Sequence, residues 1–227
     1  MSGKKYRKNA EKVKTQKYPP QEAFELLEQF EGSKFDESVD VAVRLGVDPK
    51  QSDQMVRGAV VLPHGTGKKV RVLVIAKGEK LQEAESSGVD YSGGEDLINK
   101  IKTGWVDFDK VIATPDMMGA LSKVAKVLGP RGLMPNPKSG TVTFELKKAI
   151  DEQKKGKVEF RIDKEGILHS MIGKKSFGAA KLCENFQALM EVVVKQKPAT
   201  SKGVYLRTVA VSSTHSPSVL IDPLKLM

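Results

Sequence analysis

The stretch Val70-Arg71-Val72-Leu73-Val74-Ile75-Ala76 is almost continuously apolar. A strand buried on both faces of a parallel sheet has this composition, whereas a strand with one wet face alternates. Apolar residues with helical spacing follow at residues 80–86, 93–103, 116–128 and 144–155, with short apolar segments near residue 89 and at residues 111–113. This order predicts a small parallel α/β sheet covered by helices.

The segments on both sides of this middle part alternate polar and apolar residues, as in Ser38-Val39-Asp40-Val41-Ala42-Val43-Arg44-Leu45. Alternation predicts strands with one face on a core and the other facing water or a ligand. We expect a hairpin formed by residues 158–163 and 166–172, and a further strand at residues 204–212. Helices are predicted at residues 20–30 and 177–194.

Neither flank holds enough strands for a sheet of its own. We therefore expect both ends of the chain to pair into one antiparallel α+β domain, residues 1–67 with 157–227, and residues 68–156 to form an inserted α/β domain. Glycine adopts backbone angles that other residues avoid, so the glycines at the two crossings are predicted hinge positions. They are Gly65, Gly67 and Gly156.

The charge of the chain favours an anionic partner. The 227 residues carry a formal charge of +10, and 39% of them are apolar, which is enough to bury a core. Residues 1–19 carry +6, residues 20–67 carry −5, residues 68–156 carry +4 and residues 157–227 carry +5. The positive charge is thus concentrated toward the two ends.

Little in the sequence points to catalysis, a metal or a cofactor. The three histidines are scattered, and no group of Cys and His has metal-site spacing. Residues 64–69 resemble a phosphate-binding loop, but Leu62 and Lys69 occupy positions where a Walker pattern needs glycine and Ser or Thr. Cys183 is expected to be a buried, inert thiol on the helix at residues 177–194.

We expect a cytoplasmic protein without a membrane partner. The single cysteine excludes an intramolecular disulfide, so nothing indicates an oxidising compartment. The basic N-terminus lacks the apolar core of a signal peptide, and no apolar run approaches the length of a membrane span.

A folded, helical RNA fits the composition best. Only 6% of residues are aromatic, which disfavours single-strand binding by base stacking. Helical RNA is read by shape, phosphates and 2′-hydroxyls, through Lys, Arg, Ser, Thr and short acids. Taken singly, each such residue is an ordinary surface residue, and only convergence on one face supports binding. The flanks carry these types at Lys34, Phe35, Ser38, Asp40, Arg161, Asp163, Lys164, His169, Lys174, Lys175, Thr208, Ser212, Ser213 and Thr214.

Residues 129–140 form a second notable stretch, Gly-Pro-Arg-Gly-Leu-Met-Pro-Asn-Pro-Lys-Ser-Gly. Its three glycines and three prolines exclude a helix or a central strand, and it holds two cations and no carboxylate. The flanking helix and the β-branched Thr141-Val142-Thr143 predict an ordered basic loop. A functional loop and a structural connector both remain open.

Several linked motifs resemble a known family: residues 33–40, 45–49, 56–58, 62–68, 129–137, 173–174 and 212–214. Over essentially residues 4–221 the chain is similar to the bacterial large-subunit ribosomal protein L-one family, which forms the mobile stalk beside the tRNA exit site. The resemblance implies a split antiparallel domain with an inserted Rossmann-like domain. It also implies a non-enzymatic ribosomal protein, without cofactor or metal, that is monomeric outside the ribosome.

The same resemblance implies three RNA partners. They are the 23S rRNA stalk, deacylated tRNA that leaves the E site with the stalk's movement, and the protein's own operon mRNA, whose translation it represses. In the family, RNA contacts concentrate on the split domain. The resemblance carries the RNA-binding role to Lys34, Phe35, Ser38, Asp40, Arg161, Asp163, Lys164, His169, Lys174, Ser212 and Thr214.

Two features of the motifs need a structural explanation: the residues that follow Thr214 and the loop of residues 129–140. The family usually continues Ser-Ser-Thr with Met-Gly-Pro, whereas this chain has His215-Ser216-Pro217, so a side chain occupies the place of a glycine. The role of the signature loop is open as well. Its marked residues are Gly129, Pro130, Arg131, Gly132, Pro135 and Pro137.

Two rival functions remain at this point. A phosphate-ligand enzyme would bind a nucleotide to the middle domain, and a basic coating protein would bind duplex DNA and stalk RNA alike.

Overall fold

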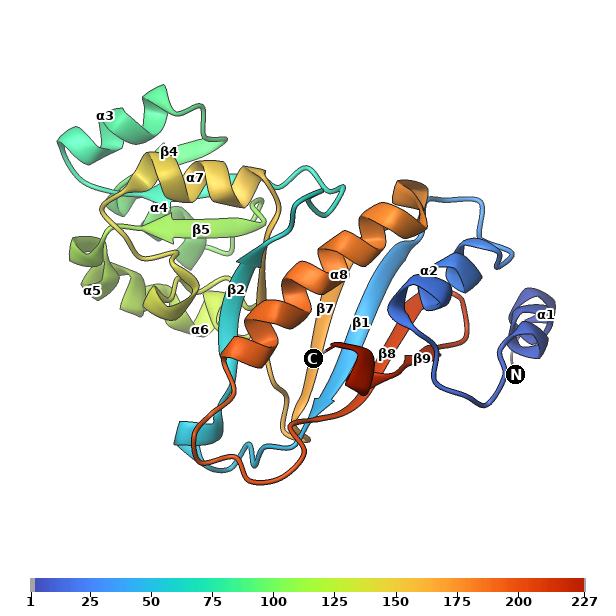
Figure 1. Cartoon of the computed structure of the whole chain (residues 1–227). Coiled ribbons are helices and arrows are strands. Elements are labelled where there is room, and N and C mark those ends of the chain that lie inside the picture. The colour runs from blue at the N-terminus through green and yellow to red at the C-terminus, as the bar shows by residue number, and fades with distance from the viewer. Residues whose placement is uncertain (1–2, 227) are drawn as a thin grey trace. The chain divides into compact units, whose positions relative to one another are not determined.

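The computed structural model describes residues 3–226, which divide into two compact units (Figure 1). The first runs up to Gly67 and resumes at Val158, and we call it the split unit. The second, Lys68–Lys157, is the inserted unit. Among the described residues, no helix is long and apolar enough to cross a membrane.

The split unit is built on an antiparallel sheet in the order β7-β1-β8-β9. β1 (Ser38–Leu45) comes from the N-terminal part of the chain. β7 (Ile167–Lys174), β8 (Leu206–Ser213) and β9 (Val219–Ile221) come from the C-terminal part. β1 lies between β7 and β8, and the predicted antiparallel sheet made from both ends of the chain is confirmed.

Two helices cover one face of this sheet, α2 (Pro20–Glu28) and α8 (Gly178–Lys195) (Figure 1). Alternate residues of β1 are buried beneath them, as the sequence pattern predicts. Phe24 of α2 and Phe186 of α8 are fully buried and meet edge to face, with ring centroids 5.5 Å apart. Because Phe24 precedes β1 and Phe186 follows β7, one core holds both ends of the chain.

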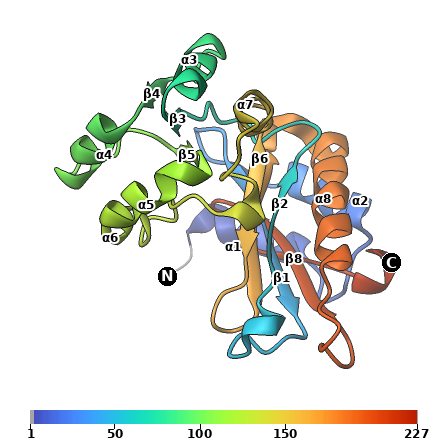
Figure 2. The same cartoon turned by 90° about the vertical axis from the view of Figure 1, so that its left-hand side faces the viewer.

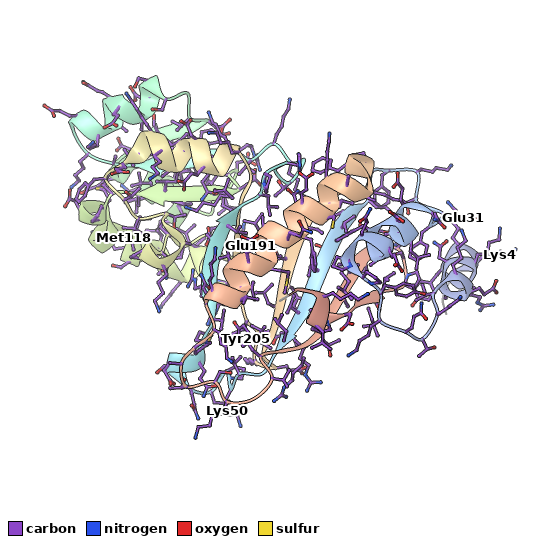
Figure 3. The ribbon with its side chains drawn as sticks, in the orientation of Figure 1. Lys4, Glu31, Lys50, Met118, Glu191 and Tyr205 are labelled. Atoms are coloured by element: carbon purple, nitrogen blue, oxygen red, sulfur yellow. The ribbon has the colours of Figure 1, made fainter. Side chains whose placement is uncertain are left out.

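The first helix, α1 (Lys4–Lys12), is attached to the loop after α2 by a buried amide. Asn9 donates to the Glu31 carbonyl at 3.1 Å and accepts from the Glu31 N–H at 2.9 Å. Figure 3 labels Glu31 and Lys4, at the start of α1, on this part of the split unit.

The predicted hairpin of residues 158–163 and 166–172 forms only around its turn, where Ile162 and Leu168 make an antiparallel bridge and the Asp163 N–H donates to the Ile167 carbonyl at 2.8 Å. The pairing does not extend along the first segment, because β6 (Lys157–Arg161) pairs instead with β2 (Arg57–Val61) in a separate two-stranded sheet. β2 and β6 are the segments that lead into and out of the inserted unit, and they lie side by side (Figure 2). Each therefore satisfies backbone groups of the other.

The inserted unit has a parallel sheet in the order β4-β3-β5. Its central strand is β3 (Val72–Ile75), between β4 (Tyr91–Gly93) and β5 (Lys110–Ala113), and every residue of β3 is fully buried. Leu73 and Ile75 face a core with α4 (Glu95–Lys102), α5 (Met118–Leu121) and α6 (Ala125–Leu128), whereas Val72 and Val74 face α3 (Glu79–Ser86) and α7 (Leu146–Lys154). The predicted Rossmann-like sheet covered by helices is confirmed.

The single helix predicted at residues 116–128 is broken. α5 and α6 are separated by a 3-10 turn, Ser122–Val124, and Ser122 Oγ donates to the Gly119 carbonyl at 2.6 Å. A hydroxyl that bonds a backbone carbonyl competes with helical hydrogen bonding, and glycine is a weak helix former. Other 3-10 turns are Ser52–Gln54, Pro115–Met117, Pro137–Ser139, Lys175–Phe177 and Pro223–Leu226.

Truncation of Phe24 tests the shared core. Phe24→Ala should cost the split unit about 3–5 kcal/mol, because it leaves a cavity against Phe186. Urea unfolding followed by circular dichroism should show an early transition for this variant. The single tryptophan, Trp105, lies in the inserted unit, and its fluorescence transition should stay in place.

Phe144→Ala is the matched control, since Phe144 is 51% exposed. It should change stability by no more than about 0.5 kcal/mol. A Phe24→Ala variant as stable as this control would contradict a single core built from both ends.

Candidate nucleic-acid interface

The sheet face of the split unit opposite the helices carries polar side chains together with small and apolar ones, and we call it the open sheet face. Successive side chains of a strand alternate between faces, so β1 contributes every second residue. The register of β1 with β7 and β8 then fixes the neighbours. The open sheet face comprises Ser38, Asp40, Ala42 and Arg44 of β1, Ile167, His169 and Met171 of β7, and Thr208, Ala210 and Ser212 of β8.

Small side chains occupy the middle of the open sheet face. Ala42 pairs with Ala210 on one side and with His169 on the other. Exposed polar side chains lie in the neighbouring rows, including Asp40 and Arg44. The two alanines therefore leave the backbone of the sheet close to the surface, with polar side chains around them.

One end of the open sheet face is tied together by hydrogen bonds. Lys174 Nζ donates to Ser38 Oγ at 3.0 Å and to the Asp36 carbonyl at 3.1 Å. The Ser38 N–H donates to Thr214 Oγ1 at 3.1 Å. These predicted site residues come from the two ends of the chain, and the fold places them in contact.

An exposed aromatic pair lies next to this end. The Phe35 ring is 55% exposed and meets the ring of His215 edge to face, with centroids 5.9 Å apart. Ser216 points back into its own turn: its Oγ accepts from the Ser213 N–H at 2.9 Å and donates to the Pro217 carbonyl at 3.0 Å. The hydroxyl of Ser216 therefore closes the turn that presents His215.

A buried carboxylate holds the loop of Phe35 against the end of β8. Glu37 is 3% exposed, and its carboxylate accepts hydrogen bonds from the Ser33 N–H at 2.8 Å and from Ser213 Oγ. Burial raises the pKa of Glu37, but the hydrogen bonds from Ser213 and Ser33 and the charge of Lys175 outweigh it, so the pKa lies below its ordinary value of 4.5. Glu37 is therefore an anchor and remains ionised at neutral pH.

At the opposite end of β7, Asp163 forms a turn. Its Oδ1 accepts from the Ile167 N–H at 2.9 Å and from the Glu165 N–H at 2.8 Å, and the Ile167 bond is the main cause of its lowered pKa. Its Oδ2 lies 3.7 Å from His169 Nε2. Arg161 and Lys164 flank this turn and are exposed.

The structure thus places the predicted residues in three groups. Ser38, Asp40, His169 and Ser212 lie on the open sheet face. Lys34, Phe35, Lys174 and Thr214 lie at one end of it, and Arg161, Asp163 and Lys164 at the turn before β7. Arg44 lies on the same face but is not among the predicted residues, although it follows Asp40 and Ala42 at intervals of two in the same strand.

The two crossings have glycines in the left-handed region. Gly65, Gly67 and Gly156 have φ of 65°, 72° and 93°. The buried amide of Asn185 accepts from the His64 N–H at 3.0 Å and donates to the Gly65 carbonyl at 3.0 Å. The first crossing is therefore fixed to the split unit as far as Gly65.

Other chemistry has little support in the structure. In the part of the chain that is described, no three His, Cys, Asp or Glu side chains are arranged to hold a metal ion. Burial and the nearby Glu184 carboxylate raise the pKa of the half-buried Cys183 thiol, which disfavours the reactive thiolate.

The split unit is thus a rigid module with one solvent-facing sheet face, backed by a packed core and flanked by exposed cations, which is an arrangement typical of binding proteins. The family model of the ribosomal protein L1p/L10e family matches residues 27–217. The large ribosomal subunit protein uL1 of Bdellovibrio bacteriovorus is 59% identical over 224 residues, which cover 98% of this chain and 96% of that relative. The chain belongs to the ribosomal protein L1 family, so the resemblance seen in its motifs is confirmed, and it is a ribosomal protein rather than an enzyme.

Replacement of Glu37 tests the anchor. Glu37→Gln should lower the free energy of unfolding at pH 7 by about 1–3 kcal/mol, because a charged, buried acceptor loses part of its hydrogen bonding. Since the folded-state pKa is lowered, this stabilisation is present above about pH 4.5 and is lost as the pH falls through the lowered value. Urea titrations at several pH values measure the difference.

The matched control is Glu25→Gln, an exposed residue in the middle of α2, away from the helix ends. It should be near neutral at every pH. A Glu37→Gln effect that is equally large at pH 3 and pH 7 would contradict the role of the ionised carboxylate.

Proposed function

We propose that this protein is a component of the large ribosomal subunit that binds the stalk of 23S rRNA through the open sheet face. The observation that carries the proposal is the convergence of polar residues from both ends of the chain on one rigid face, at Ser38, Lys174 and Thr214. The name of its uL1 relative and the family membership support the subunit assignment.

The chemistry of the face fits a folded RNA. Arg44, Lys174 and Arg161 supply charge for phosphates, and Ser38, Ser212 and Thr208 supply hydroxyls for 2′-hydroxyl and phosphate contacts. Asp40 is a short acceptor suited to 2′-hydroxyl or guanine amino donors. The sheet cannot deform freely because its other side is packed core, so an RNA of matching shape is selected.

Phe35 and His215 have a different role from the sheet. An exposed ring at the end of a polar face offers a stacking surface for one unpaired base, which duplex contacts alone do not provide. Histidine takes the position where the family usually has methionine, and its ring packs against Phe35 in a T-shaped contact.

The proposed action of the protein follows from its two units. With the stalk RNA held by the split unit, Gly67 and Gly156 act as hinge positions beyond Gly65, which Asn185 holds to the split unit. The protein moves with the stalk to assist release of deacylated tRNA from the E site. An mRNA segment that folds like the stalk site would compete for the same face, and this competition would repress translation of the protein's own operon.

A salt titration tests the phosphate contacts. The logarithm of the association constant for a stalk rRNA fragment should fall linearly with the logarithm of salt concentration, by about 0.7–0.9 per phosphate neutralised. Filter binding measures the slope. A basic coating protein would bind duplex DNA of equal length with similar affinity, so equal affinities would reject recognition of a particular RNA fold.

Removal of the Phe35 ring tests the stacking contact. Phe35→Ala should weaken binding of the stalk fragment by roughly 5–100-fold, which corresponds to about 1–3 kcal/mol of base stacking. Lys12→Ala removes an exposed charge of α1 and should weaken binding much less. Equal losses in the two variants would mean that the aromatic pair does not touch RNA.

A further inference from the structure

The signature loop of the inserted unit, residues 129–140, has no part in the open sheet face. It connects α6 to the bridge between Val142 and Ala113 at the end of β5. A connector needs only length and compatible backbone angles. The loop has in addition a fixed conformation and exposed cations, and these two properties require an explanation.

Buried hydroxyls fix the second half of the loop. Ser139 and Thr141 are each 2% exposed. Both hydroxyls donate to the Asn136 carbonyl, at 3.1 Å and 3.2 Å, and the Asn136 N–H donates to Thr141 Oγ1 at 2.8 Å. The Asn136 side chain accepts from the Lys138 N–H at 2.8 Å, so its carbonyl oxygen is engaged within the loop.

The first half is fixed by backbone turns and by the core. The Leu133 N–H donates to the Leu128 carbonyl at 3.0 Å, and the preceding Gly132 has φ of 69°, which favours glycine. Leu133 and Met134 pack against the core beneath α4 to α6, and Pro135 is buried. The loop is therefore ordered along its length without regular secondary structure.

On this fixed backbone the charged side chains point to solvent and are all positive. Arg131 and Lys138 are exposed, and neither takes part in an ion pair within the described residues. Residues 117–144 contain no Asp or Glu, whereas elsewhere in the inserted unit no acid-free run exceeds 11 residues. By contrast, Arg71 pairs with Asp107 and Asp109, and Lys77 with Glu95.

We propose that the signature loop is a second RNA contact, which holds the ribose-phosphate backbone through Arg131 and Lys138. The proposal rests on the proposed function, because RNA is the polyanion that surrounds a ribosomal protein. An ordered loop binds without the cost of ordering, which favours phosphate binding by few cations. The loop offers no exposed aromatic ring and its one amide oxygen is engaged, so base stacking and amide readout are absent and the contact rests on the two cations.

The test compares salt slopes of the full-length protein. The slope of the logarithm of the association constant against the logarithm of salt concentration should be less steep by about 1.5 in the double variant Arg131→Gln, Lys138→Gln. This change is expected for two lost phosphate contacts. The matched control is Lys100→Gln, Lys102→Gln, which removes two exposed cations of the same unit, at the C-terminal end of α4, where they complement the helix dipole. The control should leave the slope unchanged.

Three RNAs identify the source of the phosphates. A minimal stalk hairpin should bind the loop variant and the wild type alike, while either an extended rRNA fragment or a deacylated tRNA should show the reduced slope. The RNA that shows it is the partner of the loop. If the loop variant matches the control on both longer RNAs, the proposal is wrong. The proposal is also wrong if the loop variant binds polyglutamate more weakly than the wild type does but binds RNA equally well. That result would indicate that the loop binds an acidic protein.

The same titrations keep the two proposals apart. Phe35→Ala could weaken binding of the minimal hairpin while the loop variant behaves as its control on every RNA. That result would support RNA binding by the open sheet face and would contradict the proposed RNA contact of the signature loop. If the wild-type protein binds none of the RNAs better than duplex DNA, the proposed function itself fails. Circular dichroism of each variant verifies that a changed slope does not reflect unfolding.

Discussion

The position of β1 between β7 and β8 is the constraint on which the rest of the structure depends. Both partners of β1, which are β7 and β8, follow the inserted unit in the sequence. The pairing of Arg44 with Ile167 and Thr208 therefore closes very long loops. The entropy of closure grows only slowly with loop length, and the buried core under α2 and α8 compensates for it. Without this pairing, the polar residues of the open sheet face would belong to separate segments.

Buried polar groups make the pairing specific at the points where remote segments meet. Glu37 joins the loop before β1 to Ser213, and Asn185 of α8 joins the first crossing to β7 through the Ile172 carbonyl at 2.7 Å. An unsatisfied buried carboxylate or amide is costly, so any other arrangement of these segments is disfavoured. The same groups that secure the fold thereby fix the geometry of the surface around Phe35 and Thr214.

The sequence was sufficient for the features that periodicity encodes. Alternation in β1 predicted both the strand and its polar side, and the continuous apolar run of β3 predicted a strand between two layers of helices. The pairing of β6 with β2 was not predictable, because periodicity shows that a segment is a strand but not which other strand the fold brings beside it. The contact of Phe35 with His215 joins residues 180 positions apart, and no local pattern encodes it. The position of Arg44 on the open sheet face follows from the two-residue period of β1, since it lies two residues after Ala42.

The inserted unit illustrates why a Rossmann-like sheet does not imply a nucleotide site. In such sheets, phosphates bind where helix N-termini follow the carboxyl ends of the strands. Here α3 begins with Glu79 and α4 begins with Glu95 and Asp96, so carboxylates occupy the positions that a phosphate would need. Lys77, after β3, is bound to Glu95 at 3.1 Å. The sheet edge is thus electrostatically unsuited to nucleotides. The ordered loop that follows α6 instead carries exposed cations, Arg131 and Lys138, within a stretch without acids, where a fold-level analogy would not have placed a binding site.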